Sequence, residues 1–219
     1  RAAVYVNLNG HAIQVDCGPD FRQQFLSNNL HHIDLLLLTH EHQDHIAGMD
    51  DLRPLIFRQK KGVRVLATER VQNRLKEMYS YAFEEIKYPG APSFDLEEMP
   101  RVIGLDDQTH IVPIKVTHGL WPVLGFRFGK VVYLTDCKGV KPGEEVKFKG
   151  ADTLIVSGLR HKTHHSHFSL DEAIEFGKQH AFNRIIITHI SHDLGLHEEV
   201  SKNLPEGVEL GYDGQVIDL

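Results

Sequence analysis

The densest group of potential metal ligands in the chain lies in the heptapeptide THEHQDH, residues 39–45. It places His40, His42, Asp44 and His45 within six positions. Because side-chain direction repeats every two residues in an extended chain, His40 and His42 can face the same metal. Asp44 and His45 are adjacent, so they point elsewhere and suit a second metal. Imidazole and carboxylate groups are standard ligands of Zn²⁺ and its neighbours, so this loop predicts metal-dependent chemistry.

Further potential ligands stand where predicted strands end. Besides His40, the apolar runs end at or directly before four such residues: Asp16, His118, Asp136 and His189. A sheet holds its strand ends rigidly, while the loops that follow are free to carry chemistry. This recurrence predicts a site built at the ends of several strands.

The segment RHKTHHSHFS, residues 160–169, holds four more of the sixteen histidines. His167 comes two residues before Ser169, and Ser169 with Glu172 has the spacing of a helix capping box. A position beside a helix N-terminus favours phosphate oxygens, so we interpret His167 as a catalytic residue. The other three are interpreted as parts of an exposed polar loop: His161, His164 and His165.

The chain mixes hairpin signals with strand–helix units, which predicts mixed sheets covered by helices in a single domain, residues 1–219. Hairpins are predicted at Asn9-Gly10 and Asp213-Gly214. Helices are predicted at residues 20–29, with a capping box from Asp20, and at 68–79 and 169–180. Strands are predicted at residues 33–40, 63–67, 110–118, 124–128, 130–136, 153–158 and 184–189. Residues 80–110 contain several prolines and are expected to be irregular, as a lid or specificity loop.

The composition limits the classes of partner. The 219 residues are 41% apolar and contain no run long enough to cross a membrane. A net charge of −6 argues against binding to extended nucleic acid, and the basic stretch 53–64 is interpreted as a solvated turn. Only two cysteines occur, Cys17 and Cys137, which favours a reducing, cytoplasmic compartment over a disulfide framework. Because the chain begins at Arg1, we expect a short N-terminal segment to precede it.

Taken together, the loop THEHQDH and the later segments VTHG, YLTDC and ITHISH resemble the metallo-β-lactamase superfamily and occur in its order. The resemblance implies a four-layer αβ/βα sandwich of two mixed β-sheets flanked by helices, with two divalent metal ions at one edge. It implies that one metal is bound by His40, His42 and His118 and the other by Asp44, His45 and His189. Asp136 would bridge the two metals. Asp16 would support the metal loops without binding metal.

The details of the motifs favour one subgroup. The best-known β-lactamases have Arg where His45 stands and Cys where Asp136 stands, so β-lactam hydrolysis is not expected. The segments HAIQVDCGPDFRQQ, LTHEHQDHIAGMDDLRPL and THISH resemble the phosphoribosyl 1,2-cyclic phosphodiesterases of the carbon–phosphorus lyase pathway, which are related to RNase Z. Some members of this subgroup carry an upstream Cys-rich segment that binds a structural zinc. The resemblance implies that His192 would complete that site.

The expected activity is that of a phosphoric diester hydrolase acting on a small cyclic or nucleotide-like substrate. A hydroxide shared by two metals, Zn²⁺ or Mn²⁺, would attack phosphorus, Asp136 would help to hold it, and His167 would stabilise the phosphoryl charge or protonate the leaving oxygen. Formal charges of +4 from the metals and −3 from their anionic ligands leave roughly +1, which attracts a phosphate anion. An RNase Z-like ribonuclease, a thioester or lactone hydrolase, and a non-catalytic ligand-sensing domain remain alternatives. No membrane partner is expected, and a homodimer is left open.

Overall fold

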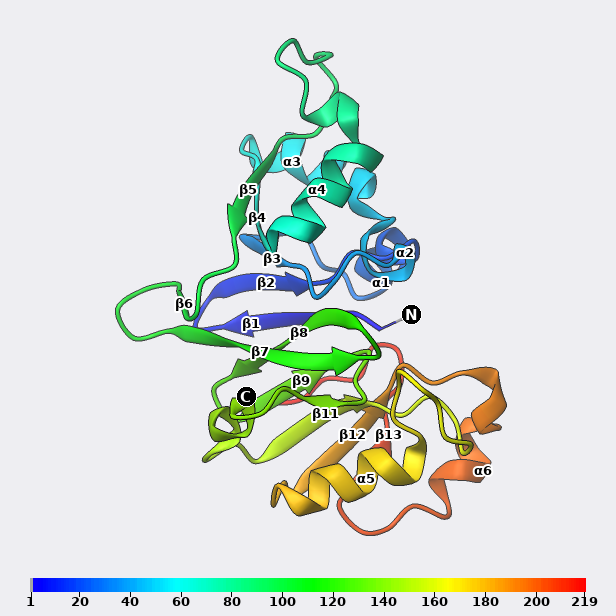
Figure 1. Ribbon diagram of the computed structural model, residues 1–219. Coiled ribbons are helices and arrows are strands. Elements are labelled where there is room, and N and C mark those ends of the chain that lie inside the picture. The colour runs from blue at the N-terminus through cyan, green and yellow to red at the C-terminus, as the bar shows by residue number, and fades with distance from the viewer. Residues whose placement is uncertain (1) are drawn as a thin grey trace. The chain divides into compact units, whose positions relative to one another are not determined.

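The computed structural model describes residues 2–219, which form two compact units divided between Pro100 and Arg101. Each unit contains a β-sheet with helices beside it, coloured blue to green for the first unit and green to red for the second (Figure 1). Each unit also has its own hydrophobic core. The two mixed sheets with flanking helices are those predicted from the sequence.

The first unit contains a sheet in the order β1-β2-β3-β4-β5. Its strands are β1 (Val4–Leu8), β2 (His11–Val15), β3 (Leu35–Leu37), β4 (Val63–Ala67) and β5 (Phe94–Glu98). β1 and β2 are antiparallel around the predicted Asn9-Gly10 turn, and β2 to β5 are parallel. The helices are α1 (Phe21–Ser27), α2 (Gln43–Ile46), α3 (Arg53–Gln59) and α4 (Glu69–Met78), with short 3-10 helices η1 (Met49–Leu52) and η2 (Ser80–Ala82).

Burial explains why these residues form this layer. All three β3 residues are at most 2% exposed, because a parallel sheet covered by helices has no solvent face. Helix α4 buries Val71 and Leu75, which are four residues apart on one face, and packs against β4 (Figure 1). The sheet thus ends in rigid strands from which the ligand-bearing loops leave.

The second unit contains a sheet in the order β10-β7-β8-β9-β11-β12-β13, with β6 paired to β7. Its strands are β6 (Ile103–Gly104), β7 (His110–His118), β8 (Trp121–Phe128), β9 (Val131–Leu134), β10 (Gly139–Val140), β11 (Thr153–Ser157), β12 (Arg184–Thr188) and β13 (Val208–Leu210). β7, β8 and β9 are antiparallel neighbours, whereas β9, β11, β12 and β13 are parallel. The helices are α5 (Leu170–Gln179) and α6 (His197–Ser201), with 3-10 helices η3 (Glu144–Phe148) and η4 (His192–Leu194).

Helix α5 begins where the capping box predicted. The Ser169 hydroxyl accepts a hydrogen bond from the Glu172 backbone N–H at 3.3 Å, and the Glu172 carboxylate accepts one from the Ser169 N–H at 2.8 Å. The helix buries Leu170, Ala173 and Gly177 and packs on β11 and β12 (Figure 1). Its start, and therefore the position of the preceding His167, is fixed.

Three local predictions were wrong. Residues 80–110 are not wholly irregular, because Phe94–Glu98 forms β5 along β4 between flanking prolines that obscured its pattern. No strand follows the Asp213-Gly214 turn in residues 211–219, since β13 pairs with β12 in parallel instead of forming a hairpin. The Asp20 side chain makes no capping hydrogen bond to α1. Within residues 2–219, no helix has the length and apolar content needed to cross a membrane.

Candidate metal centre

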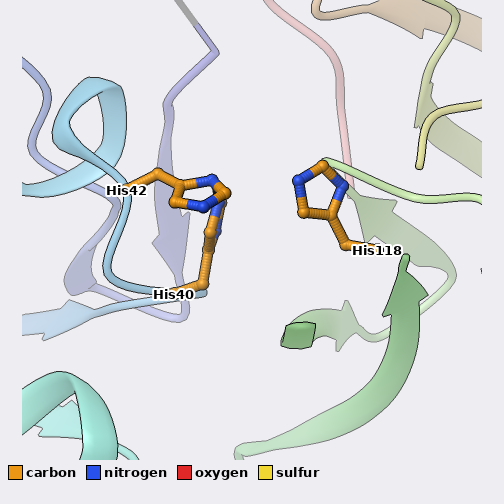
Figure 2. A group of neighbouring side chains, drawn as sticks. All are labelled: His40, His42 and His118. Atoms are coloured by element: carbon orange, nitrogen blue, oxygen red, sulfur yellow. Dashed lines mark hydrogen bonds between the residues drawn. The ribbon is translucent and has the colours of Figure 1, made fainter. Parts of the chain in front are cut away.

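In the first unit, the loop after β3 brings His40 and His42 together. His40 is 1% exposed, and its Nε2 lies 2.9 Å from Nδ1 of His42. Figure 2 shows the two imidazoles side by side on this loop, and also shows His118 at the end of β7 in the second unit. The backbone of His42 is extended, with φ −66° and ψ 149°. An extended backbone turns side chains two residues apart to the same side, which agrees with the adjacent ring nitrogens of His40 and His42.

Directly after His42 the backbone becomes helical, because α2 starts at Gln43. This change of backbone conformation turns the side chains of the next two candidate ligands, Asp44 and His45, in another direction. His45 Nε2 lies 3.4 Å from Asp44 Oδ2, so these neighbours form a second pair of donor atoms. The loop therefore carries two donor pairs on one short segment.

The buried carboxylate of Asp16 orders this loop. It accepts hydrogen bonds from the Thr39 N–H at 2.9 Å, the Thr39 hydroxyl at 2.8 Å and His45 Nδ1 at 2.7 Å. A carboxylate can only accept, so the proton of His45 sits on Nδ1 and the lone pair is on Nε2. The Thr39 hydroxyl donates its only proton to Asp16, so His40 Nδ1, 3.0 Å away, must donate to Thr39. His40 likewise presents the lone pair of Nε2.

Two glycines allow the backbone to approach the loop closely. A Cβ atom added at Gly18 would lie 2.1 Å from the Asp44 carbonyl oxygen, and one at Gly48 would lie 1.9 Å from the Gly18 carbonyl oxygen. Backbone hydrogen bonds join the same segments, from Cys17 N to His45 O at 2.7 Å and from Gly48 N to Cys17 O at 2.8 Å. Neither glycine nor Thr39 stands in a sequence pattern that predicts this role. Only the tertiary contact identifies them.

In the second unit, the candidate ligands come from separate strands. His118 ends β7, Asp136 follows β9 and His189 follows β12. Nε2 of His189 lies 3.1 Å from Asp136 Oδ1, and Nδ1 of His167 lies 3.2 Å from the same oxygen. Donor atoms of His118, Asp136 and His167 all lie within 4.8 Å of one another. The ends of β7, β9 and β12 and the loop before α5 thus meet at Asp136.

The main chain fixes the tautomer of His118. Its Nδ1 donates to the carbonyl oxygen of Ser166 at 3.0 Å, which leaves the lone pair on Nε2. The loop that carries Ser166 is tied to the Asp136 loop by a backbone hydrogen bond from Phe168 N to Cys137 O at 2.7 Å. On the other side, the Ser157 hydroxyl accepts from Cys137 N at 3.0 Å. These contacts hold His118, Asp136 and His167 in one arrangement.

Three of the candidate residues have left-handed backbone conformations. The φ angles are 59° at Asp16, 45° at Asp136 and 52° at His189. Each residue directly follows a strand or lies within two residues of its end. Residues other than glycine visit this region at a cost, although Asp and His do so more readily than most. Such conformations concentrate at functional sites, where they aim a side chain away from the strand that precedes it.

The distances between the donor atoms fit a divalent metal ion such as Zn²⁺. Two N or O ligands on one tetrahedral zinc, each bound at 2.0–2.2 Å, are about 3.3 Å apart. The three donor pairs formed by His40 with His42, Asp44 with His45, and Asp136 with His189 are separated by 2.9, 3.4 and 3.1 Å respectively. All donors are nitrogen or oxygen, which suits Zn²⁺, Mn²⁺ or Fe²⁺.

His167 is half-buried, and burial lowers its pKa to about 4. The Asp136 carboxylate opposes this shift, while neighbouring imidazoles reinforce it. The ring is therefore neutral at neutral pH. Its Nδ1 is buried and makes no hydrogen bond with the residues that the structure describes. His167 lies close enough to Asp136 and His118 to belong to a third group of potential metal ligands, a placement not predicted from the sequence.

The other residues singled out in the sequence belong to none of these donor groups. His161 and His165 are exposed, as interpreted from the sequence. His164 is half-buried instead, and its ring is tilted against those of His165 and His167, with centroids 4.3 and 5.1 Å away. The side chain of His192 is 95% exposed. Both cysteines are free and buried, and burial raises the pKa of Cys17 and brings that of Cys137 to about 12.

Comparison with known proteins establishes the family. Residues 11–190 match the family described as the beta-lactamase superfamily domain, and the chain belongs to it. This confirms the predicted superfamily and fold class. A crystal structure described as a new diphosphatase from the PhnP family has 34% sequence identity and a TM-score of 0.89, over 98% of this chain and 82% of that one. The likeness supports the predicted subgroup.

Two further relatives extend the picture. The crystal structure of human tRNase Z, short form, has 21% identity and a TM-score of 0.76 over 99% of this chain and 92% of that one, and this shows the fold alone. A protein of Porphyromonas gingivalis named octanoyltransferase is 36% identical over 210 residues, which are 94% of this chain. The chain spans only 42% of that protein's length.

Proposed function

We propose that this protein is a phosphodiesterase that uses two divalent metal ions, Zn²⁺ or Mn²⁺, to hydrolyse a small cyclic or nucleotide-like phosphodiester. In this proposal one metal would be bound by His40, His42 and His118. The other would be bound by Asp44, His45 and His189, and Asp136 would bridge both. The observation that carries it is the set of hydrogen bonds that fixes Nδ1 of His40, His45 and His118 as a donor and leaves Nε2 of each available to a metal.

When bound, two such metals activate a water molecule and polarise a phosphoryl oxygen. The chain's own residues do the rest. Asp16 keeps His45 in one tautomer, and through Thr39 it does the same for His40. The neutral ring of His167, beside Asp136, can donate an N–H hydrogen bond to a phosphoryl oxygen. To protonate the leaving oxygen, the ring first accepts a proton from the attacking water molecule and then passes it on.

Two kinds of phosphorus–oxygen bond are candidates for hydrolysis, the ester bond of a phosphodiester and the anhydride bond of a diphosphate. The 34% identical PhnP-family structure is described as a diphosphatase, which suggests an anhydride as well as an ester. A singly charged diester suits a site of roughly +1 formal charge, whereas a dianionic monoester could bridge both metals and inhibit. We therefore propose diesters as substrates and monoesters as inhibitory products.

Acyl-group hydrolysis is the second candidate, because the P. gingivalis relative is named octanoyltransferase. Transfer through a cysteine thioester receives no support within this chain, since both cysteines are buried and burial raises their pKa values. A metal-dependent hydrolysis of thioesters or lactones would use the same donor groups and must be tested beside phosphodiesters. An RNase Z-like ribonuclease rests on a likeness that shows only the fold.

The test is an activity screen on protein reconstituted with Zn²⁺ or Mn²⁺, with metal content measured on the same samples. The substrates are bis(p-nitrophenyl) phosphate, the monoester p-nitrophenyl phosphate, a 2′,3′-cyclic nucleotide, ribose 1,2-cyclic phosphate, a dinucleoside diphosphate, an octanoyl thioester and a β-lactam. We expect two metals per chain and the highest kcat/KM on a diester. One metal per chain at saturation would refute the two-metal site, and a monoester or thioester cleaved faster than every diester would refute the substrate class.

A further inference from the structure

The turn between β7 and β8 presents exposed apolar side chains directly after a candidate ligand. Residues 119–122 are all exposed; Leu120 is 100% and Trp121 44% exposed. Gly119 has a φ of 58°, whereas Leu120 is not among the residues of positive φ, as expected of the tight type II′ hairpin turn. The turn is thus well defined, and its apolar tip is not an accident of a loose loop.

The register of the hairpin puts Trp121 beside His118. The two residues are directly opposite each other across β7 and β8, so their side chains lie on the same face of the sheet with Cβ atoms roughly 5 Å apart. Pro122 follows Trp121 and restricts its backbone to extended conformations. The indole therefore has a fixed origin next to an imidazole that is itself only 5% exposed.

The histidine-rich loop borders the same turn. A Cβ atom added at Gly119 would lie 3.5 Å from Cβ of Ser166, and His118 Nδ1 bonds to the Ser166 carbonyl. His167 is the next residue, and its ring centroid is 4.5 Å from that of His118. A phosphoryl group in contact with His167 would therefore have Trp121, across the sheet from His118, as an aromatic neighbour of its substituents.

We propose that Trp121 is the specificity-determining residue of this site and stacks on a flat aromatic ring, such as a nucleobase, carried by the phosphodiester. This rests on the proposed function, whose substrate class it narrows to nucleotide-like diesters. Stacking of a base on an aromatic side chain contributes roughly 5- to 100-fold in binding. The face of an indole can stack on any of the bases. We therefore expect the site to prefer substrates that carry an aromatic ring over substrates that carry none, without selecting one base.

A second copy of this chain is the competing occupant of the turn. A stable protein interface buries on the order of 800 Å² on each partner, far more than a tip made of Leu120 and Trp121 can offer. The position opposite His118 also has no bearing on self-association, whereas it is what a substrate platform requires. The geometry thus favours a small-molecule ring.

The chain contains one tryptophan, so its fluorescence reports on this position alone. The experiment titrates adenosine monophosphate and, separately, ribose 5-phosphate into zinc-loaded protein. We expect quenching by the nucleotide and little change with the sugar phosphate. Absence of quenching by the nucleotide overturns the inference. Quenching without turnover of any diester overturns the proposed function but leaves the aromatic platform standing.

Variants give a second readout. Trp121→Ala should lower the ratio of kcat/KM for a 2′,3′-cyclic nucleotide to that for ribose 1,2-cyclic phosphate by roughly 5- to 100-fold, mainly through KM, and Trp121→Phe should restore most of it. Leu120→Ala, one residue away in the same turn, is the matched control and should leave the ratio unchanged. An unchanged ratio in Trp121→Ala overturns the inference. So does a change of oligomeric state on gel filtration in Trp121→Ala but not in Leu120→Ala, since it would assign the indole to self-association.

Discussion

The two units assemble their candidate ligands in opposite ways. The first unit carries four of them in one loop of six residues, between β3 and the end of α2. The second unit takes His118, Asp136, His167 and His189 from positions as far as 71 residues apart and brings them together through the register of its sheet. One half is specified by local sequence and the other by long-range pairing.

The way in which each half is held also differs. In the first unit a side chain, Asp16, fixes the imidazole of His45 directly and that of His40 through the Thr39 hydroxyl. In the second unit the main chain performs this task, because the Ser166 carbonyl fixes His118. A single substitution can therefore disorder the first half, whereas the second is sensitive mainly at the ligands themselves.

The largest effect is expected at Asp136, the residue at which the second half converges. Asp136→Ala should lower kcat by at least about 10³-fold and reduce the content of both proposed metals, since the proposed bridging ligand is lost. His40→Ala should also abolish turnover but should leave more of the second metal bound. Metal analysis after dialysis distinguishes them. Equal metal loss in the two variants would contradict the bridging role of Asp136.

His167 tests whether the second half contains a catalytic residue as well as ligands. His167→Ala should lower kcat by about 10²–10⁴-fold and keep both proposed metals, because the proposal assigns their binding to seven other residues. The loss should be smaller for p-nitrophenyl diesters than for ribose diesters, since a p-nitrophenolate leaves without a proton. His161→Ala, an exposed residue of the same loop, is the control and should stay within a few-fold of the parent. Loss of metal in His167→Ala would make it a ligand instead.

Asp16 tests the idea that a side chain orders the first half. Asp16→Ala should weaken metal binding by about 10- to 100-fold, as removal of a partner that orients metal-binding histidines does. Asp16→Asn should be milder because one acceptor oxygen remains. Competition with a chelator measures the affinity, and Asp95→Ala, an exposed carboxylate on β5, is the control. Unchanged metal affinity in Asp16→Ala would show that the loop is ordered without this carboxylate.

Gly18 gives the smallest effect and tests backbone packing in the first half. Gly18→Ala places a methyl group 2.1 Å from the Asp44 carbonyl, so the loop must shift, and we expect a loss of about 1–3 kcal/mol in unfolding free energy. Gly104→Ala is the matched control, because nothing lies within 4 Å of its Cβ position. Denaturant unfolding of the two variants measures the difference. Equal stability would mean that the close approach carries no cost.

The sequence by itself determined the parts of this protein that are local. The alternation around Asn9-Gly10, the buried run before His40, and the Ser169–Glu172 capping box each correspond to the hairpin, strand and helix start of the structure. The loop 39–45 could be predicted as a group of metal ligands because its four ligand-type side chains lie within six consecutive positions. Its likeness to a known superfamily, which the comparison confirms, supplied the fold class.

Only the tertiary structure decided how the candidate ligands are held. Thr39, Ser166, Gly18 and Gly48 carry no chemical signal of their own, and their roles come from hydrogen bonds and close approaches between segments distant in sequence. Strand β5 and the parallel pairing of β13 were missed for the same reason, since pairing partners are chosen by the sheet and not by the local pattern. The position of Trp121 opposite His118 likewise follows from hairpin register, because the two-residue turn Gly119-Leu120 places the two side chains on one face of the sheet.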